Sequence, residues 1–219
     1  FDQFLNFFSY GGTWATNNAE KPGAGIGGVF NFEDSGFSIS GNYIAMDGSS
    51  TGIGNDKTSS TSSWQLFYEG EAFDGLMLAQ LGFSYEQNIF LPVATNAAYK
   101  FEGDSRLGYS AGVAWMPNDP GIIPSISTGF SLSDPQDNDK NITGWYVGFK
   151  WDDVLYEENS LGFAVGQAPK INADYNKIYE IFYEIFVNDF IKVTPAYFAV
   201  DNYSGDELSG NLVHGGAIK

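Results

Sequence analysis

Three groups of residues in this 219-residue chain have types and spacings that could carry chemistry. The first is Gly23, Gly25 and Gly28, which have the G-x-G-x-x-G spacing of a dinucleotide-binding turn. Such a turn needs a strand before it and a helix after it. Here Pro22 and a polar loop precede the glycines, and the alternating sequence VFNFE follows them. The context therefore argues against a nucleotide site, and we expect no cofactor.

The other two groups are an acidic loop and a lone histidine. Asp134, Asp137 and Asp139 offer oxygen ligands, but the loop lacks the glycine and the terminal glutamate of an EF-hand. A solvated loop and a weak divalent-cation site stay open as interpretations, and no metal ligand is assigned. His214 is the only histidine, and no nucleophile motif accompanies it, so a histidine-based triad has no support. We therefore expect no catalytic residue and no enzymatic activity.

The composition excludes several classes of protein. The chain has 27 acidic and 10 basic residues, and its formal net charge of −17 argues against nucleic acid as a partner. It has no cysteine, which excludes a disulfide framework and thiolate metal sites. The chain contains no run of about 18 apolar residues, so the sequence predicts no transmembrane helix. No signal peptide is visible at Phe1, so we expect a mature or truncated chain.

The segment 177–200 has the most regular pattern in the chain, and it predicts two strands joined by Asn188-Asp189. Tyrosine, isoleucine and valine alternate with glutamate and phenylalanine before the turn, and the alternation continues after it. A period of two places alternate side chains on opposite faces of a strand. Each arm has about ten residues, the length with which a tilted strand crosses a bilayer. One face is apolar and the other mixed, which is typical of a membrane β-barrel.

From Gly25 onward this unit repeats as five hairpins, and an eleventh strand begins near Gly215. The connections alternate in length, and short periplasmic turns with longer external loops are typical of outer-membrane barrels. The sequence therefore predicts an all-β fold, an antiparallel transmembrane β-barrel in the outer membrane. Short turns are expected at 34–36, 74–75, 118–121 and 188–189, long segments at 47–62, 87–104, 134–141, 169–176 and 201–214, and a turn of unusual length at 152–159.

We expect the chain to have two parts. In residues 1–24, phenylalanine and leucine at positions 1, 4, 5 and 8 have helical spacing, and a polar, glycine-rich loop follows. This part is either a helix packed on the outside of the sheet or an inward-folded segment that constricts the lumen. Residues 25–219 are expected to form the barrel domain, a partial one of about ten to eleven strands.

Alternate positions along each expected strand form two sets of residues, one uncharged and one polar. The uncharged set is expected to face lipid or a neighbouring subunit, because an Arg or Lys there costs about 2–4 kcal/mol at the bilayer midplane. It includes Trp64, Tyr109, Val147, Trp151, Ile181 and Val193. The polar set is expected to line the pore, and its charged and amide residues are Glu33, Glu69, Glu71, Gln80, Glu86, Arg106, Lys150, Glu180, Glu184 and Lys192.

The excess of carboxylates in the polar set predicts a weak preference for cations. The alternative is that these glutamates pair with the lysines and the arginine, which would leave no selectivity.

Four stretches of the chain resemble the porin domain of cyanobacterial outer-membrane porins, a family of iron-uptake porins related to the carbohydrate-selective porins. They are GAGIGGVFNFEDSGFSISGNYIA at 23–45, SLGFAVGQAPKI at 160–171, YEIFYEIFVNDFIKVTPAYF at 179–198 and GGAIK at 215–219. Their order matches the family and covers nearly the whole chain, and GQAPK and VNDFIKVTP are the most specific. Members also carry a signal peptide, a periplasmic S-layer-homology segment and further strands that end on an aromatic residue, none of which is seen here.

The resemblance implies passive diffusion of small hydrophilic solutes and inorganic ions through an outer-membrane homotrimer. Iron as a cargo comes from the family name alone. The resemblance also implies contact with outer-membrane lipid, and attachment to peptidoglycan through the S-layer-homology segment not seen in this chain. The alternative is a secreted β-sandwich that binds ligands as lectins do, which alternating strands alone would permit. A sandwich would stay soluble without detergent.

Overall fold

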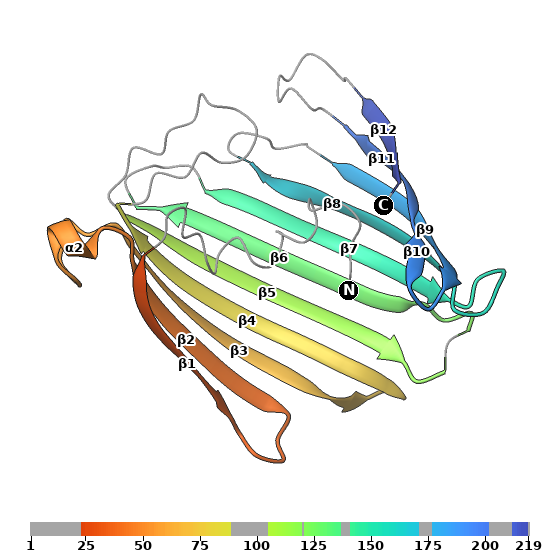
Figure 1. Ribbon diagram of the computed structural model, residues 1–219, viewed down its shortest axis with the longest axis horizontal. Coiled ribbons are helices and arrows are strands. Elements are labelled where there is room, and N and C mark those ends of the chain that lie inside the picture. Colours follow the sequence, from red (N-terminus) through yellow and green to blue (C-terminus); the bar gives the residue numbers. More distant parts are fainter. Residues whose placement is uncertain are drawn as a thin grey trace.

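The chain folds as one antiparallel β-sheet in the computed structural model, which describes residues 23–88, 105–119, 121–136, 141–170, 177–201 and 212–218 (Figure 1). The expected all-β fold is therefore confirmed, and one four-residue helix, α2 (Gly48–Thr51), lies between two of the strands. The strands are β1 (Ala24–Asn31), β2 (Phe37–Ala45), β3 (Ser60–Ala72), β4 (Gly75–Gln87), β5 (Ser105–Pro117), β6 (Ser125–Pro135), β7 (Ile142–Asp152), β8 (Ser160–Lys170), β9 (Ile178–Asn188), β10 (Ile191–Val193), β11 (Pro195–Val200) and β12 (Val213–Ile218).

Within the described ranges, no helix is long and apolar enough to span a membrane. Of the expected constriction segment 1–24, residues 1–22 lie outside the described residues, and Ala24 already begins β1.

Each strand pairs with its neighbours along the chain, in the order β1-β2-β3-β4-β5-β6-β7-β8-β9-β11-β12. Because neighbouring strands are antiparallel, every second connection lies at the same end of the sheet. The connections that follow β1, β3, β5, β7 and β9 lie at one end, and we call it the short-turn end (Figure 1). The connections that follow β2, β4, β6, β8 and β11 lie at the other, long-connection end. The predicted hairpin order is confirmed, but the alternation of short and long connections holds only in part. Because β5 ends at Pro117 and β6 begins at Ser125, the connection 118–124 is longer than the β6–β7 connection 136–141 at the other end.

The tenth expected strand is divided into β10 and β11. β10 pairs with β9, where the register shifts between Ile191 and Lys192. β11 then pairs with β9 on one side and with β12 on the other. Thr194, which is 3 % exposed, lies at the break. The sheet therefore has eleven strands side by side, and the short strand β10 pairs with β9 alone.

Two predicted turns are shifted by one residue. The β3–β4 turn is Phe73-Asp74, and both residues have positive φ, 53° and 57°. Gly75, which is expected in the turn, begins β4 instead, because it pairs with Ala72 of β3 and with Pro117 of β5. A side chain would have no room there. A Cβ on Gly75 would lie 2.5 Å from Nε1 of Trp115, which donates a hydrogen bond of 2.9 Å to the Ala72 carbonyl. The last turn is likewise residues 189–190, because Asn188 is still within β9.

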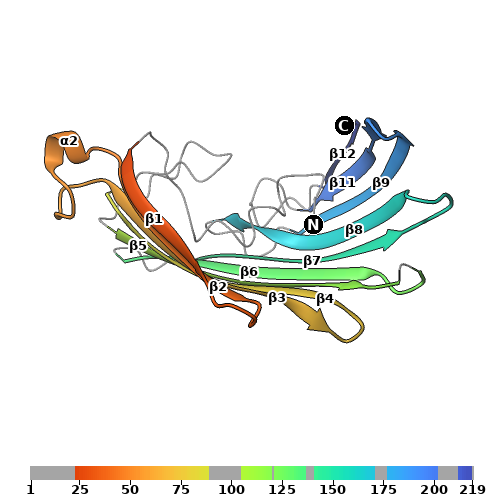
Figure 2. The same ribbon diagram turned by 60° about the horizontal axis from the view of Figure 1, so that its bottom comes forward.

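The expected closed barrel is not formed by the described strands. β1 pairs with β2 alone and β12 with β11 alone, so the sheet keeps two open edges. In Figure 2 the sheet is curved like a trough, with β1 at one raised side and β9, β11 and β12 at the other. The physical reason lies in the strand number. With eleven strands in chain order, the first and last run in the same direction, whereas bacterial single-chain barrels close with an even number of antiparallel strands.

The two faces of the sheet differ in composition, and the register carries each face across every strand pair. Trp64, Leu81 and Ile181 share one face, which we call the apolar face. Ser84 and Glu180 share the other, the polar face. Apart from the ends of β6 and β8, where the register pairs Asp134 with Leu107 and Lys170 with Thr143, no described strand places an aspartate, glutamate, lysine or arginine on the apolar face. The predicted division by parity therefore holds along the sheet, except where the register shifts between β7 and β8.

Large side chains on the polar face are accommodated by glycines directly across from them. Gly162 of β8 is opposite Phe182 of β9, and a Cβ on Gly162 would lie 2.1 Å from the ring. Gly129 of β6 is opposite Tyr146 of β7 in the same way, at 2.4 Å. A glycine opposite an aromatic residue lets the ring lie flat over the neighbouring strand.

We expect Gly162→Ala to lower the free energy of unfolding by about 1–3 kcal/mol, because the Phe182 ring must leave its position. The denaturant midpoint of the folded protein measures this loss. Gly28→Ala is the matched control, since a Cβ there would meet no atom within 4 Å. Equal midpoints for the two variants would contradict the packing of Phe182 over Gly162.

Candidate functional site

Exposure is inverted relative to a water-soluble protein. On the apolar face, Trp64 is 53 % exposed and Leu81 59 % exposed, whereas on the polar face Ser84 is 1 % and Glu180 2 % exposed. The buried side chains of the described residues are mostly serine, threonine and glutamate. Because side chains converge on the inside of a curved sheet, this burial assigns the polar face to the concave side of the trough. The polar face is therefore the candidate functional surface.

The most connected polar group on this face lies at the short-turn end, around Glu184 of β9. Ser160 of β8 donates to Glu184 Oε2 at 2.8 Å, and Lys192 Nζ of β10 lies 2.8 Å from Oε1. Lys150 of β7 lies 3.4 Å from Oε2 and 3.2 Å from a carboxylate oxygen of Asp152. We call these five residues the Glu184 cluster. It ties four strands together through a carboxylate that is 8 % exposed.

A second ion pair lies at the long-connection end. Glu86 of β4 and Arg106 of β5 are direct cross-strand partners, and the Arg106 guanidinium donates to the Glu86 carboxylate. Their side chains are 3 % and 11 % exposed. Between the two ends, Gln65 Nε2 donates to Gln80 Oε1 at 2.9 Å, across β3 and β4. The concave face thus carries polar groups along its full height.

Nine of the ten predicted pore-lining residues lie on the polar face, and one does not. Glu33 lies in the β1–β2 turn instead, because β1 ends at Asn31. Glu69 and Glu71 are exposed near the short-turn end, and Gln80 lies at the middle of β4. Glu86 and Arg106 form the ion pair at the long-connection end. Lys150, Glu184 and Lys192 belong to the Glu184 cluster, and Glu180 is buried closer to the long-connection end.

Sequence reasoning left open whether the glutamates pair with basic side chains, and the geometry provides such pairs. The ion pairs among the described residues join Glu86 to Arg106, Glu184 to both lysines, and Asp152 to Lys150. Parity could not place Asp152 or Ser160 in the Glu184 cluster, because their proximity depends on the β7–β8–β9 register. The excess of carboxylates that remains on the described polar face comes from residues such as Glu69 and Glu71.

The polar face is not uniformly polar, as the sequence already indicated. Ala164, Ile178 and Val200 form a small apolar cluster between β8, β9 and β11, with Tyr146 and Phe198 packed against it. This cluster covers the part of the concave face near β12. The charged and hydroxyl side chains are therefore concentrated on the strands before it and at the two ends.

The apolar face has aromatic residues near both of its ends, with polar atoms turned toward the connections. At the short-turn end, Trp151 Nε1 donates to the Ile122 carbonyl at 3.1 Å, and Tyr183 donates to the Val154 carbonyl at 2.6 Å. At the other end, the Tyr43 hydroxyl accepts a hydrogen bond of 3.1 Å from the Gly54 amide. Two belts of tyrosine and tryptophan around an apolar band are typical of proteins at a membrane–water interface.

The six residues predicted to face lipid or a subunit all lie on the apolar face. The register places Trp64, Tyr109, Val147, Trp151, Ile181 and Val193 there. Trp64, Tyr109 and Ile181 are 53 %, 42 % and 44 % exposed.

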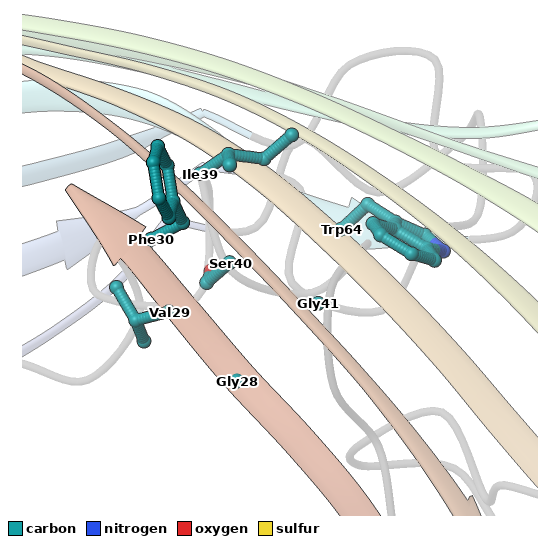
Figure 3. A pocket seen from close by; sticks show the side chains of 7 residues that line it. All are labelled: Gly28, Val29, Phe30, Ile39, Ser40, Gly41 and Trp64. Carbon is teal, nitrogen blue, oxygen red and sulfur yellow. The ribbon is translucent and has the colours of Figure 1, made fainter. Parts of the chain in front are cut away.

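Near the β1 edge the apolar face has a notch of about 370 Å³. Figure 3 shows Gly28 and Gly41 at its floor, with Phe30 and Ile39 on one side and Trp64 on the other. The two glycines are direct cross-strand partners, which leaves the space open. No side chain that lines the notch is titratable, so it offers no acid, base or metal ligand.

The connection 46–59 at the long-connection end is held together by Asp47. Its Oδ1 accepts a hydrogen bond of 2.7 Å from the Ser59 amide and one of 3.1 Å from Thr51 Oγ1. Desolvation raises the pKa of Asp47, but these hydrogen bonds to the carboxylate outweigh it and leave the pKa below its usual 3.8. Gln87 and Asn88 donate to the Asn55 and Asp56 carbonyls and fasten the connection to the end of β4.

Acid is therefore expected to loosen this connection. The hydrogen bonds of the Asp47 carboxylate are fully present above its usual pKa of 3.8 and are lost as the pH falls through the lowered folded-state value. A spin label on Asp56→Cys should gain mobility below that pH. The label should be mobile at every pH when Asp47→Ala is added. A label on Ser35→Cys in the β1–β2 turn is the control, and an equal response there would contradict a role for Asp47.

A comparison of the chain with protein-family models gives no match, and comparisons with curated proteins and with solved structures give none either.

Proposed function

We propose that this chain forms the wall of an outer-membrane porin, through which small hydrophilic solutes and inorganic ions diffuse passively. One observation carries the proposal: the sheet exposes its apolar face and buries its polar one. A large apolar side chain left in water forfeits about 1.5–3 kcal/mol. An exposed apolar surface that spans the whole sheet is far larger than the few hundred Å² that soluble monomers show. Lipid around the apolar face removes this cost.

The length and the ends of the strands support the same environment. β3, β4 and β5 have 13 residues each, and a tilted strand needs about 9–11 residues to cross the hydrocarbon core. The aromatic belts then lie at the two interfaces, and the uncharged middle of the apolar face lies in hydrocarbon. In a β-sandwich, by contrast, the apolar faces of two sheets pack against each other. Here the described strands form a single sheet.

The open edges set a condition on this proposal. In hydrocarbon, every backbone N–H and C=O needs a partner, so lipid-exposed sheet edges do not occur. β1 and β12 must therefore be joined through further strands. Since the eleven described strands leave β1 and β12 parallel, an odd number of added strands closes the sheet with antiparallel pairs throughout.

The remaining features of the proposal concern orientation and partners. Barrels of this type keep short turns in the periplasm and long connections outside, so the short-turn end is the periplasmic one. In line with the resemblance, we include a homotrimer whose subunits meet on the apolar face, and attachment to peptidoglycan through a segment outside this sequence. Iron remains one candidate cargo among small ions.

Cysteine labelling and conductance test the proposal. The chain has no cysteine, so single cysteines report their own positions. Val147→Cys on the apolar face should resist a water-soluble thiol reagent in membranes, while Lys150→Cys on the polar face should react. The full-length protein should need detergent for solubility and should produce conductance steps in a planar bilayer. A detergent-free soluble protein, or the reverse labelling pattern, would refute the porin wall and favour a secreted β-sandwich.

A further inference from the structure

A row of apolar side chains extends from the short-turn end into solvent. Four neighbouring turns each carry one or two of them, and we call the set the apolar turn row. Its members are Phe73, Ile122, Ile123, Leu155, Tyr156 and Phe190, with exposures of 87 %, 95 %, 62 %, 83 %, 72 % and 96 %. They lie beyond the strand ends and therefore outside the band of the sheet that we assign to lipid.

The spacing of the turns makes these residues a continuous surface. The turns follow β3, β5, β7 and β9, so consecutive turns are two strands apart along one edge of the sheet (Figure 1). With strands about 4.8 Å apart, the row has a repeat of about 10 Å and a length of about 30 Å. That length matches the side of a standard protein–protein interface of about 800 Å² per partner.

Two members of the row have backbone conformations that their residue types disfavour. Phe73 has φ of 53° and Leu155 has φ of 66°. The left-handed region is uncommon for bulky residues, and the two-residue turn that holds Phe73 prefers asparagine or glycine there. Folding of the turns alone therefore does not account for an exposed phenylalanine and an exposed leucine at these positions.

The charges beside the row are of one sign. The same four turns hold six exposed carboxylates, on Asp74, Asp119, Asp153, Glu157, Glu158 and Asp189. The sequence of these turns contains no lysine or arginine. The nearest described lysines on the adjoining strands, Lys150 and Lys192, are bound to Glu184 and Asp152. The surface therefore combines apolar side chains with negative charge.

We propose that the apolar turn row is a docking surface for a protein partner with a basic surface that has shallow apolar pockets. Charge complementarity supports this occupant, because such a surface neutralises the six carboxylates while its pockets remove the apolar tips from water. A lipid surface fits less well, because anionic head groups repel a carboxylate-rich row. This docking surface depends on one part of the proposed function, namely that the short-turn end faces water.

A four-site variant tests this surface without disturbing the strands. It combines Phe73→Asn, Ile122→Ser, Leu155→Asn and Phe190→Ser, keeps every charge, and relieves the positive φ at two sites. The probe is a synthetic 20-residue peptide of alternating lysine and leucine, with a lysine–serine peptide as its control. Binding to the full-length protein in nanodiscs is measured against empty nanodiscs, which removes the binding of the peptide to lipid.

We expect the lysine–leucine peptide to bind the wild-type protein at least about tenfold more tightly than the variant. A tenfold difference in Kd corresponds to about 1.4 kcal/mol of binding free energy. The lysine–serine peptide should bind both equally and more weakly. Equal binding of the lysine–leucine peptide to both proteins would overturn the proposal, because charge alone would explain it. Contact of the apolar turn row with lipid is tested separately, with a fluorescent dye attached to Phe190→Cys. Quenching of this dye by spin-labelled lipid would also overturn the proposal.

Conductance separates this proposal from the proposed function. The four-site variant should conduct like the wild type in a planar bilayer, because the changed residues lie outside the polar face. If neither protein conducts, the porin proposal fails, while the peptide-binding difference still decides the docking surface.

Discussion

Replacing Leu81 by lysine is expected to lower the free energy of unfolding by about 2–4 kcal/mol, the cost of a lysine on the lipid face near the bilayer midplane. Leu81 is the central residue of β4, it lies on the apolar face, and it is 59 % exposed. If the apolar face lies in lipid, a lysine that replaces this exposed leucine places its ammonium group in hydrocarbon. In water, the same exposure would make the substitution nearly neutral, so the size of the effect reports the surroundings of the apolar face.

The matched control is the adjacent residue. Gln80 also lies at the middle of β4, but its side chain is on the polar face and accepts a hydrogen bond from Gln65. Gln80→Lys should cost about 1 kcal/mol, the value of one hydrogen bond. Urea titrations of both variants folded into vesicles measure the difference. Equal losses for the two substitutions would show that the two faces have the same environment.

Removing the carboxylate of Glu184 is expected to change stability and ion selectivity together. Glu184→Gln leaves Lys150 and Lys192 without their shared partner, and breaking a buried ion pair in this way costs about 3–5 kcal/mol. The two lysines are 31 % and 37 % exposed, so we expect about 2–3 kcal/mol. Their released charges should also shift the reversal potential of the channel toward anions under a potassium chloride gradient.

Glu69→Gln distinguishes the two effects. Glu69 is exposed on the same face, so its removal should move selectivity toward anions with little change in the unfolding midpoint. A Glu184→Gln variant with unchanged stability would show that the cluster does not bind the strands together. A reversal potential that moves toward cations would refute the charge argument for both residues.

The all-β fold, the hairpin order and the two faces could be predicted from the sequence, because alternation is a local signal. Tyr179, Ile181 and Tyr183 alternate with Glu180, Phe182 and Glu184, and any extended backbone separates these two sets. The turn at Phe73-Asp74 was misplaced, because glycine after aspartate normally marks the turn. Here Gly75 pairs with Pro117 of β5, and that pairing joins residues far apart in the chain.

The candidate site was predictable in outline only. Parity assigned Lys150 and Glu184 to the same face, but their 3.4 Å approach depends on how β7, β8 and β9 are aligned. The closed barrel was also expected on local grounds. Closure is a property of strand number and curvature, and no pattern within one hairpin contains it.

The order of the strands has a consequence for cooperativity. Every described strand pairs with segments adjacent to it in the chain, so the stability of the sheet is a sum of nearest-neighbour terms, as in a repeat protein. Such a sheet can begin to fold at any hairpin and grow outward in both directions. Until further strands join its edges, a strand in the middle, such as β5, is held on two sides, whereas β1 and β12 are each held on one. Before the sheet closes, backbone amides should therefore exchange with solvent in a graded sequence, first at the two edges and last at the centre.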